Sequence, residues 1–358
     1  MSHKAAVLTK VGAPLEDVTV PTPKLGEDEV LVEVQYICLS PLDIWRSKQG
    51  LLTETPKILG GAFSGRVAAL GPKVVDRHDL AVGVAVSCFS GHLGIGAHQQ
   101  YVVVPWWCLS KLEEKADLAA ASTINDNLVT AVWSLTHGGI RLPLFDFRAG
   151  DRLKPILVWG GSSSVGQNAL QLLKLQGYER VYTTSSQRHV ARMKSLGAFD
   201  VIDYNSADAS TLLMAATDGK GFEAVLDCIG DVDASLQPSL RLVRPGGIVA
   251  AMLPYVRRTG GAGAGAGSQA VFMDVAEIPL KVPEGVTLIG VRTHQYHHDE
   301  EYKLTVQPEM VPRFAFSGMP YRLVGQKDSK TSLAERLNEA LETLNAGVSG
   351  ERIVVAVP

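Results

Sequence analysis

Cysteine is scarce and scattered in this sequence. The 358 residues include four cysteines, none of them in a C-x-x-C pair: Cys38, Cys88, Cys108 and Cys228. This spacing leaves a zinc knuckle or zinc ribbon unsupported. Residues 1–10 lack the sustained apolar stretch of a signal peptide, and a chain of this length needs no disulfide staples. We therefore expect reduced, mostly buried thiols and a cytoplasmic location.

Long blocks of one charge and long apolar runs are also missing. The 34 basic residues nearly balance the 37 acidic residues, and the formal net charge is -3. An electrostatic footprint for nucleic acid or anionic lipid is therefore absent. No apolar run approaches the roughly 20 residues that a membrane span needs. The sequence predicts no nucleic-acid partner and no membrane, which leaves small-molecule chemistry.

The sequence does contain enough apolar material for a full interior. Hydrophobic residues make up 46% of it and charged residues 20%, as in globular proteins, and the length favours two domains. Short strand-like runs separated by Gly and Pro predict an antiparallel, barrel-like first domain. These runs cover residues 30–34, 65–70, 82–88 and 100–104.

The pattern changes after residue 117. A helical apolar spacing covers residues 118–135, and apolar strands then alternate with helices. The strands are expected at 155–159, 180–184, 201–203, 224–227 and 247–252, and the helices at 164–176, 189–196, 210–217 and 235–242. This alternation predicts an α/β fold with a doubly wound, parallel sheet of the Rossmann type.

The end of the chain is too short to form a domain of its own. It offers a strand at 287–291, an irregular stretch, a helix at 332–344 and a strand at 352–357. We expect residues 1–126 and 291–358 to form one discontinuous domain, and residues 127–290 the nucleotide-binding domain. Residues 259–268 are almost entirely Gly and Ala, which predicts a mobile loop. A tolerated surface insertion and a lid over the active cleft are both compatible with this composition.

A glycine-containing turn joins the first strand and helix of the alternating region. Residues 160–166 read Gly-Gly-Ser-Ser-Ser-Val-Gly. A helix that starts directly after such a turn presents unpaired N–H groups and its positive dipole end to a pyrophosphate. The glycines do not complete G-x-G-x-x-G, so the prediction rests on the strand before and the helix after. The cofactor-binding residues predicted here are Gly161, Ser162, Ser163, Ser164 and Val165.

The end of the next strand indicates which cofactor the turn binds. Residues 181–184 lead into Ser185-Ser186-Gln187-Arg188, where an NAD enzyme has Asp or Glu on the ribose 2′-hydroxyl. No acid is present there. Ser185 and Arg188 can instead bind a 2′-phosphate, because a guanidinium group matches phosphate oxygens. NADPH is the predicted cofactor; the alternative for Arg188 is a solvated charge on a helix face.

Six motifs in order resemble those of the medium-chain dehydrogenase/reductase superfamily. They lie at residues 60–65, 160–166, 196–204, 227–230, 245–247 and 349–355. The greatest similarity is to its zinc-independent quinone-oxidoreductase and fungal trans-acting enoyl-reductase branch. The resemblance implies a GroES-like, partly open β-barrel domain combined with the Rossmann domain.

The resemblance also implies where zinc would bind in the zinc alcohol dehydrogenases of this superfamily. Their ligand positions correspond here to Ser40, Gly61, Ala62 and Asp126. Two of these four have no side chain that can coordinate, whereas zinc needs three or four N, S or O ligands. We therefore predict no metal, and without a Lewis acid alcohol oxidation is disfavoured. Hydride transfer from NADPH to an activated double bond does not need a Lewis acid, because the cofactor supplies the reductant.

Further site residues are implied by their positions in the family motifs. Ser40 and Asp43 are expected near the nicotinamide, and Thr130 near its ribose. Tyr204 is expected beside the 2′-phosphate, and Arg352 near the pyrophosphate. Ile229, in the 227–230 motif, is a further cofactor-binding candidate. We name no proton donor, because Leu51 and Leu52 occupy the stretch where some enoyl reductases have Tyr; protonation by solvent is the default.

Each of these residues also has a structural alternative. Asp43 can cap a helix, the Thr130 hydroxyl can bond to the main chain, and Tyr204 can be half-buried without a ligand. The run from His297 to Glu301 resembles a metal cluster, but adjacent side chains diverge, so we expect a solvated loop. Trp106 and Trp107 are expected to cover a barrel edge, with a substrate wall as the alternative.

The sequence thus predicts an NADPH-dependent, zinc-free reductase of an activated C=C bond in an enoyl, enone or enal compound. The acceptor is a small molecule or a chain on a carrier, and the protein is a monomer or a homodimer. An NADPH:quinone oxidoreductase shares the same apparatus and is the first alternative. A non-catalytic NADPH-binding or sensor protein is an alternative of another class.

Overall fold

The computed structural model describes residues 1–75, 79–143, 152–258, 269–314, 318–325 and 330–358. Contacts divide the chain into two compact units. Unit 1 comprises Met1–Asn127 and His297–Pro358, and unit 2 comprises Leu128–Tyr296. The Gly- and Ala-rich stretch 259–268, predicted to be a loop or lid, lies outside the described residues. The predicted domain boundaries at 126/127 and 290/291 stay a prediction.

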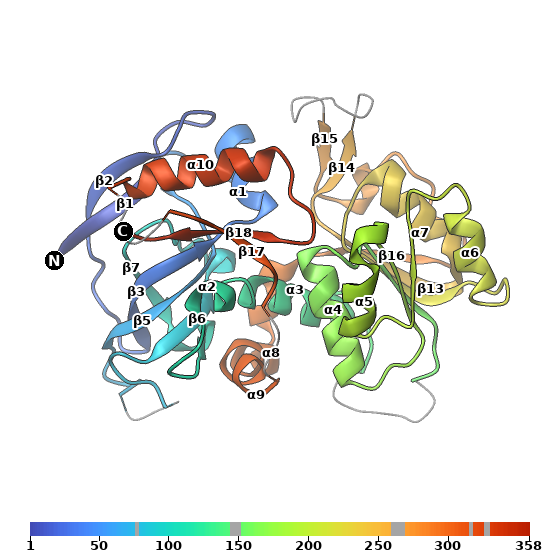
Figure 1. The fold of residues 1–358 in the computed structure, drawn as a ribbon, viewed down its shortest axis with the longest axis horizontal. Helices are drawn as coiled ribbons and strands as arrows, with labels where there is room; N and C mark the ends of the chain where they lie inside the picture. The colour runs from blue at the N-terminus through green and yellow to red at the C-terminus, as the bar shows by residue number, and fades with distance from the viewer. Residues whose placement is uncertain (76–78, 144–151, 259–268, 315–317, 326–329) are drawn as a thin grey trace. The chain divides into compact units, whose positions relative to one another are not determined.

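Unit 1 is built on a largely antiparallel sheet in the order β17-β18-β3-β5-β6-β8, with β7 paired to β3 (Figure 1). Its strands are β3 (Glu29–Cys38), β5 (Ala62–Leu70), β6 (Ala85–Phe89), β7 (Tyr101–Pro105), β8 (Leu109–Lys111), β17 (Tyr321–Val324) and β18 (Arg352–Ala356). A second sheet has the order β2-β1-β4, formed by β1 (Ser2–Leu8), β2 (Glu16–Pro21) and β4 (Lys57–Ile58). This architecture confirms the predicted GroES-like, partly open barrel.

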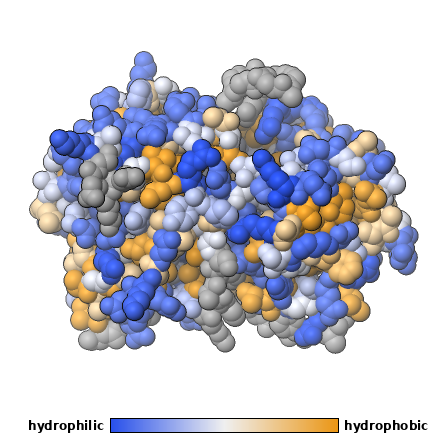
Figure 2. Space-filling view, in the orientation of Figure 1, coloured by the Kyte–Doolittle hydropathy of each residue, from blue (hydrophilic) through white to orange (hydrophobic). Residues whose placement is uncertain are grey.

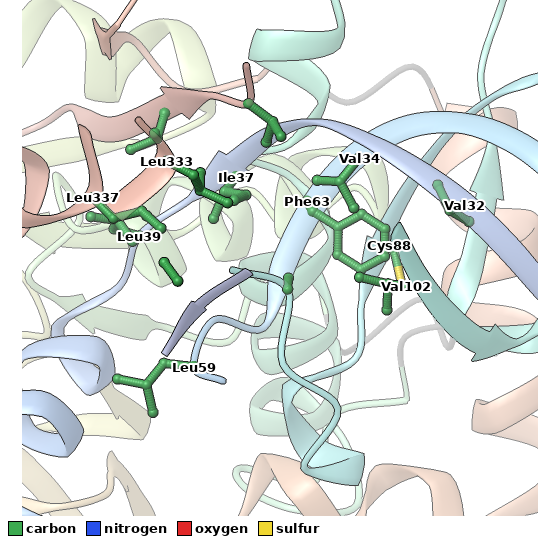
Figure 3. Close-up of a cluster of buried hydrophobic side chains, with 14 of the residues drawn as sticks. Val32, Val34, Ile37, Leu39, Leu59, Phe63, Cys88, Val102, Leu333 and Leu337 are labelled. Carbon is green, nitrogen blue, oxygen red and sulfur yellow. The ribbon is translucent and has the colours of Figure 1, made fainter. Parts of the chain in front are cut away.

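The core of unit 1 joins these strands to the last helix, α10 (Leu333–Asn345). Figure 3 shows the buried side chains of β3 and β5 beside those of α10. The helix starts at a capping box, in which Ser332 Oγ accepts from the Glu335 N–H and Glu335 Oε2 accepts from the Ser332 N–H. Leu333, Leu337 and Leu341 then repeat every four residues on one buried face.

The other helices of unit 1 are short. They are α1 (Pro41–Gln49), α2 (Leu118–Ala121), α8 (Glu300–Thr305), α9 (Val311–Phe314), the 3₁₀ turns η1 (Gly91–Leu93) and η2 (Trp106–Cys108), and the π-helix η7 (Val306–Met310). The 3₁₀ turn η6 (Thr293–His298) spans the boundary between Tyr296 and His297. The predicted helix 118–135 is wrong as one piece, because it is interrupted between α2 and α3 (Asn125–Leu135). There the Ser122 and Thr123 hydroxyls donate to the carbonyls of Ala119 and Ala120 and compete with helical bonds.

The predicted loop at residues 297–301 is also wrong, because the segment is mostly helical, although His298, Glu300 and Glu301 are exposed as predicted. His297, the residue before the end of η6, stacks on the ring of Trp107 with the ring centroids 6.0 Å apart, and Asp299 caps α8 by accepting from two backbone N–H groups. Trp106 and Trp107 contact the core of the barrel, as their predicted edge position requires. The helical segment 300–314 is therefore part of unit 1.

Gln307 fastens this segment to the barrel. Its side chain is fully buried, and its Oε1 accepts from the Phe89 N–H at 2.8 Å and from Asn125 Nδ2 at 3.0 Å. Gln307 Nε2 donates to the Phe89 carbonyl, and Ser110 Oγ donates to the Gln307 carbonyl. One amide thus satisfies several buried polar groups of the barrel.

Unit 2 is a six-stranded parallel sheet in the order β11-β10-β9-β12-β13-β16 (Figure 1). The strands are β9 (Ile156–Trp159), β10 (Val181–Thr184), β11 (Asp200–Ile202), β12 (Phe222–Asp227), β13 (Val243–Met252) and β16 (Thr287–Val291). The order reverses at β9, which is the switch point where such sheets bind ligands. The predicted doubly wound Rossmann sheet is confirmed.

Two pairs of helices cover this sheet. α4 (Ser164–Leu175) contacts α5 (Val190–Leu196), and α6 (Ala209–Ala215) contacts α7 (Gln237–Leu242), which follows the π-helix η4 (Val232–Leu236). A hairpin of β14 (Tyr255–Arg258) and β15 (Gln269–Phe272) follows β13, and the 3₁₀ turns are η3 (Gln187–His189) and η5 (Val275–Glu277). All four residues of β9 and of β10 are buried, as expected for strands covered on both faces.

The face of the molecule in Figure 2 is mostly hydrophilic. Figure 2 shows apolar side chains in separate patches between hydrophilic ones. Within the described ranges, no helix is both long enough and apolar enough to cross a bilayer. The four cysteines are free thiols, and three of them are buried, as predicted.

The Gln307 contacts predict a stability effect. Gln307→Leu removes the acceptor of the Phe89 N–H and of the Asn125 amide, and should lower the free energy of unfolding by about 2–4 kcal/mol. Urea unfolding followed by circular dichroism measures it. Gln295→Leu, the same replacement at an exposed position, should change stability by roughly 0.5 kcal/mol or less. Equal effects of both replacements would contradict the anchoring role.

Candidate functional site

The predicted phosphate loop connects β9 to α4 at the switch point of the sheet. The Gly160 N–H donates to Thr184 Oγ1 and the Gly161 N–H to the Thr184 carbonyl, both at 2.9 Å. Ser163 is the N-cap of α4, and its Oγ accepts from the Gly166 N–H at 3.1 Å. The turn is thus fixed to the end of β10, and helix α4 begins at a defined point. Its first N–H groups form the kind of site that binds phosphate.

Three glycines of the turn are required by close contacts. A Cβ on Gly161 would lie 2.1 Å from Thr183 Oγ1, and one on Gly166 would lie 2.4 Å from the Gly160 carbonyl oxygen. Gly160 has φ +82°, in the left-handed region. Of these three, sequence reasoning named only Gly161, because it looked for the spacing G-x-G-x-x-G. Ser162, Ser164 and Val165 lie half-buried in the same turn and first helical turn.

The end of β10 carries the residues predicted to bind a 2′-phosphate. Ser185 is fully buried, and its hydroxyl donates to the Ser186 carbonyl at 3.1 Å. Arg188 is exposed, and its Nε donates to His189 Nε2 at 3.2 Å. Tyr204, two residues after β11, is 48% exposed. The structure therefore places Arg188 and Tyr204 where solutes reach them, whereas the Ser185 hydroxyl is engaged with the main chain.

The segment after β12 contains a buried carboxyl group. Asp227 Oδ1 accepts from the N–H groups of Ile229 and Gly230 at 2.9 and 3.1 Å, and Ser235 Oγ donates to Oδ2 at 2.8 Å. Burial raises the pKa of Asp227 to about 6 despite these bonds. Ile229 is 44% exposed and lies against Gly160, where a Cβ would be 2.6 Å from Ile229 Cδ1. The structure thus brings predicted Ile229 to the phosphate loop.

Ser40 and Asp43, the predicted residues near the nicotinamide, contact each other in unit 1. Ser40 caps α1, and Asp43 Oδ2 accepts from the Ser40 N–H at 2.8 Å and from its hydroxyl at 3.1 Å. Asp43 is only 3% exposed. The alternative that Asp43 caps a helix is therefore observed, and its carboxylate also orients the Ser40 hydroxyl.

Arg352 and Thr130 lie in different units. The Arg352 guanidinium group is buried in unit 1, where its Nη2 donates to Asp126 Oδ2 at 2.8 Å and its Nε to Cys38 Sγ at 3.1 Å. Burial raises the pKa of Cys38 to about 12, so the thiol is protonated at neutral pH. Thr130 is half-buried in α3, and its carbonyl accepts from the Ser134 hydroxyl. The pyrophosphate role of Arg352 stays a prediction, although two of its three nitrogens are already bound.

Comparison with known proteins agrees with this geometry. A family model described as an alcohol dehydrogenase GroES-like domain matches residues 26–114, and one described as a zinc-binding dehydrogenase matches residues 164–252. The trans-enoyl reductase tazE of Aspergillus terreus is 31% identical over 251 residues, which cover 68% of this chain and 81% of that protein.

Two solved structures have the same fold. The CurK enoyl reductase superposes with a TM-score of 0.76 at 17% identity, over 99% of each chain. A mycobacterial protein solved in complex with NADPH superposes with a TM-score of 0.72 at 21% identity, also over 99% of each chain. Together with the phosphate loop and the GroES-like barrel, these matches define a two-domain oxidoreductase. The chain belongs to the medium-chain dehydrogenase/reductase superfamily, beside its fungal enoyl reductases, as its motifs predict.

The zinc implied by the name of one family model does not fit the residues at its ligand positions. Gly61 and Ala62 offer no donor atom. The Asp126 carboxylate is bound by Arg352, and the Ser40 hydroxyl donates to Asp43. Asp126 Oδ2 is therefore already paired with a guanidinium cation, which disfavours a metal ion at the same carboxylate.

Asp227 predicts a pH effect on stability. Its pKa of about 6 in the folded protein exceeds the unfolded value near 4, so its contribution to stability is present below pH 4 and is lost as the pH rises through 6. Asp227→Asn does not ionise: its Oδ1 can still accept from the Ile229 and Gly230 N–H groups, and its Nδ2 can donate to Ser235 Oγ, whose hydroxyl also donates to the Asp231 carbonyl. The variant should therefore gain about 3 kcal/mol relative to the parent protein between pH 4 and pH 7.

Urea unfolding of both proteins across this pH range tests the sign. Asp218→Asn, the same change at an exposed residue, controls for general charge effects. A stability difference between Asp227→Asn and the parent that stays constant with pH would show that the carboxyl group titrates normally.

Proposed function

We propose that the protein is an NADPH-dependent enoyl reductase that reduces an activated C=C bond. The observation that carries the substrate class is the similarity to a trans-enoyl reductase over two thirds of the chain. A substrate of this type accepts a hydride at the β-carbon and a proton at the α-carbon, so that NADPH and one proton are consumed per double bond. NADPH supplies the hydride when it is bound.

The proposal includes a preference for NADPH over NADH, which requires a binding site for the 2′-phosphate. The support is the basic residue Arg188 at the exposed end of β10, where an NAD-specific chain has a carboxylate. Gly161, Ser162, Ser163, Ser164 and Val165 hold the pyrophosphate through the N-terminus of α4. Tyr204 flanks the 2′-phosphate, and Ile229 lies over the dinucleotide. Ser185 contributes mainly by shaping the turn, because its hydroxyl is engaged.

Ser40, Asp43 and Thr130 are the proposed residues of the reaction centre. Asp43 holds the Ser40 hydroxyl in one orientation, so that this polar group can accept or donate a hydrogen bond at the substrate. Thr130 lies beside the nicotinamide ribose in this proposal. The developing enolate takes its proton from solvent, and the task of the residues is positioning and electrostatic stabilisation.

The partner is an unsaturated carbonyl compound, either free or attached to a carrier. We also propose that the protein works in the cytoplasm as a monomer or a homodimer. Neither nucleic acid nor a membrane enters the proposed reaction, in keeping with the nearly balanced charge of the chain.

A panel of acceptors tests the reaction class. Oxidation of NADPH should be measured with enoyl thioesters, enones, enals, quinones and simple ketones, and the products identified. Saturated products from the first three groups support the proposal. Turnover of quinones alone would assign a quinone reductase, and tight NADPH binding with no oxidation by any acceptor would assign a non-catalytic NADPH-binding protein.

The cofactor preference is tested at Arg188. Arg188→Glu sets a carboxylate against the 2′-phosphate, so it should weaken NADPH binding by roughly 100-fold and NADH binding by less than about threefold. Titration calorimetry measures both. Arg241→Glu makes the same charge change at an exposed position in α7 and should spare both cofactors. Equal losses for the two cofactors would refute the assignment of the 2′-phosphate site.

A further inference from the structure

Arg192 lies in α5, directly beside the helix that carries the phosphate loop. Its Nε donates to Gln167 Oε1 at 2.6 Å, and Gln167 Nε2 donates to the carbonyl of Ser162 at 3.0 Å. Gln167 is fully buried, so this relay cannot rearrange freely. Two hydrogen bonds in series thus fix the Arg192 guanidinium group relative to the phosphate loop.

The surroundings of the Arg192 guanidinium group are unfavourable for a cation unless an anion binds there. Gln167 belongs to the first turn of the twelve-residue helix α4, where unpaired N–H groups and the helix dipole already contribute positive potential. Arg188 lies one helical turn before Arg192 in the chain. Burial and then the charges of Arg188 and Arg192 hold the pKa of His189 below its usual range. Two guanidinium groups thus act on His189, and the Asp203 carboxylate, which accepts from the Gln187 N–H, lies at the same strand ends.

Arg192 also has an unused donor. Its Nη2 is inaccessible to solvent and has no hydrogen-bond partner among the described residues. A buried N–H group without an acceptor costs free energy, and burial lowers the pKa of the Arg192 guanidinium group. Exposed Arg188 differs in this respect, because water can satisfy its free N–H groups.

We propose that Arg192 is a second specificity-determining residue for the 2′-phosphate of the dinucleotide, positioned by Gln167. The inference rests on the proposed NADPH site and deepens it. Arg188 approaches the phosphate from solvent with an exposed side chain. Arg192 keeps Nε on Gln167 and offers Nη1, the terminal nitrogen that is not closed to solvent, to the phosphate oxygens, so that its geometry is set before the ligand arrives.

The test compares two ligands that differ only in the 2′-phosphate. Calorimetry should measure binding of 2′,5′-ADP and of 5′-AMP to the full-length protein, because neither ligand depends on the substrate or the nicotinamide. Arg192→Met keeps an unbranched stem out to about the position of Nε and removes the guanidinium charge. It should weaken 2′,5′-ADP roughly 10- to 100-fold and 5′-AMP less than about twofold.

Two further variants separate positioning from charge. Arg192→Lys keeps the charge without the fork and should give an intermediate loss for 2′,5′-ADP. Gln167→Met removes the tether but not the cation and should lower the preference for 2′,5′-ADP by less than Arg192→Met does. A purely structural role of Gln167 would lower the affinity for both ligands equally and would overturn its positioning role.

Arg244→Met is the matched control. Arg244 pairs with Glu223 at the amino ends of β12 and β13, at the opposite edge of the same sheet, and its replacement should leave both affinities unchanged. Equal losses of both ligands in Arg192→Met, or no loss, would overturn the role of Arg192. If Arg188→Glu still lost 2′,5′-ADP selectively, the proposed NADPH site would stand. Equal binding of both ligands to the parent protein would refute that site itself.

Discussion

The attachment of the phosphate loop to the end of β10 is the constraint on which the rest of unit 2 depends. The N–H groups of Gly160 and Gly161 both bind Thr184, through its hydroxyl and its carbonyl. This residue immediately precedes Ser185 and lies four residues before Arg188, so one position fixes the loop close to the proposed 2′-phosphate residues. The start of α4 and the contact between Ile229 and Gly160 follow from the same attachment. The site is thus a property of two neighbouring parallel strands rather than of a flexible loop.

Much of the fold was predictable because unit 2 repeats a strong pattern. Its strands are short apolar runs buried on both faces, and amphipathic helices separate them. Helix α1 and the segment 300–314 lacked such a signal. α1 is a short, largely polar helix that begins at the Ser40 and Asp43 capping box, and the 300–314 segment depends on Gln307, whose partners lie about 180 to 220 residues earlier in the sequence. Contacts of that kind leave no local periodicity.

Some features of the candidate site were likewise predictable from the sequence, and others were not. Strand and helix context located the phosphate loop, and the missing acid after β10 suggested the cofactor. The sequence could not show that Gly166 must be glycine because of the Gly160 carbonyl, nor that the Ser185 hydroxyl turns to the main chain. The pair of Arg192 and Gln167 lies 25 residues apart on two helices, and only tertiary structure brings it together. Arg352 likewise finds Asp126 and Cys38 through the sheet of unit 1 rather than through a motif.

The position of β18 has a consequence for the order in which the molecule forms. This strand lies between β3 and β17 in the main sheet of unit 1, and its Val354 and Val355 pair with Cys38 and Ile37. During synthesis β3 therefore emerges some 300 residues before β18, and its edge at Tyr36–Cys38 stays unpaired meanwhile, whereas β7 pairs with Glu29–Glu33 of β3 much earlier. The strands of unit 2 need only partners from residues 156–291. The nucleotide-binding unit can consequently become compact on the ribosome while the barrel still waits for its closing strand.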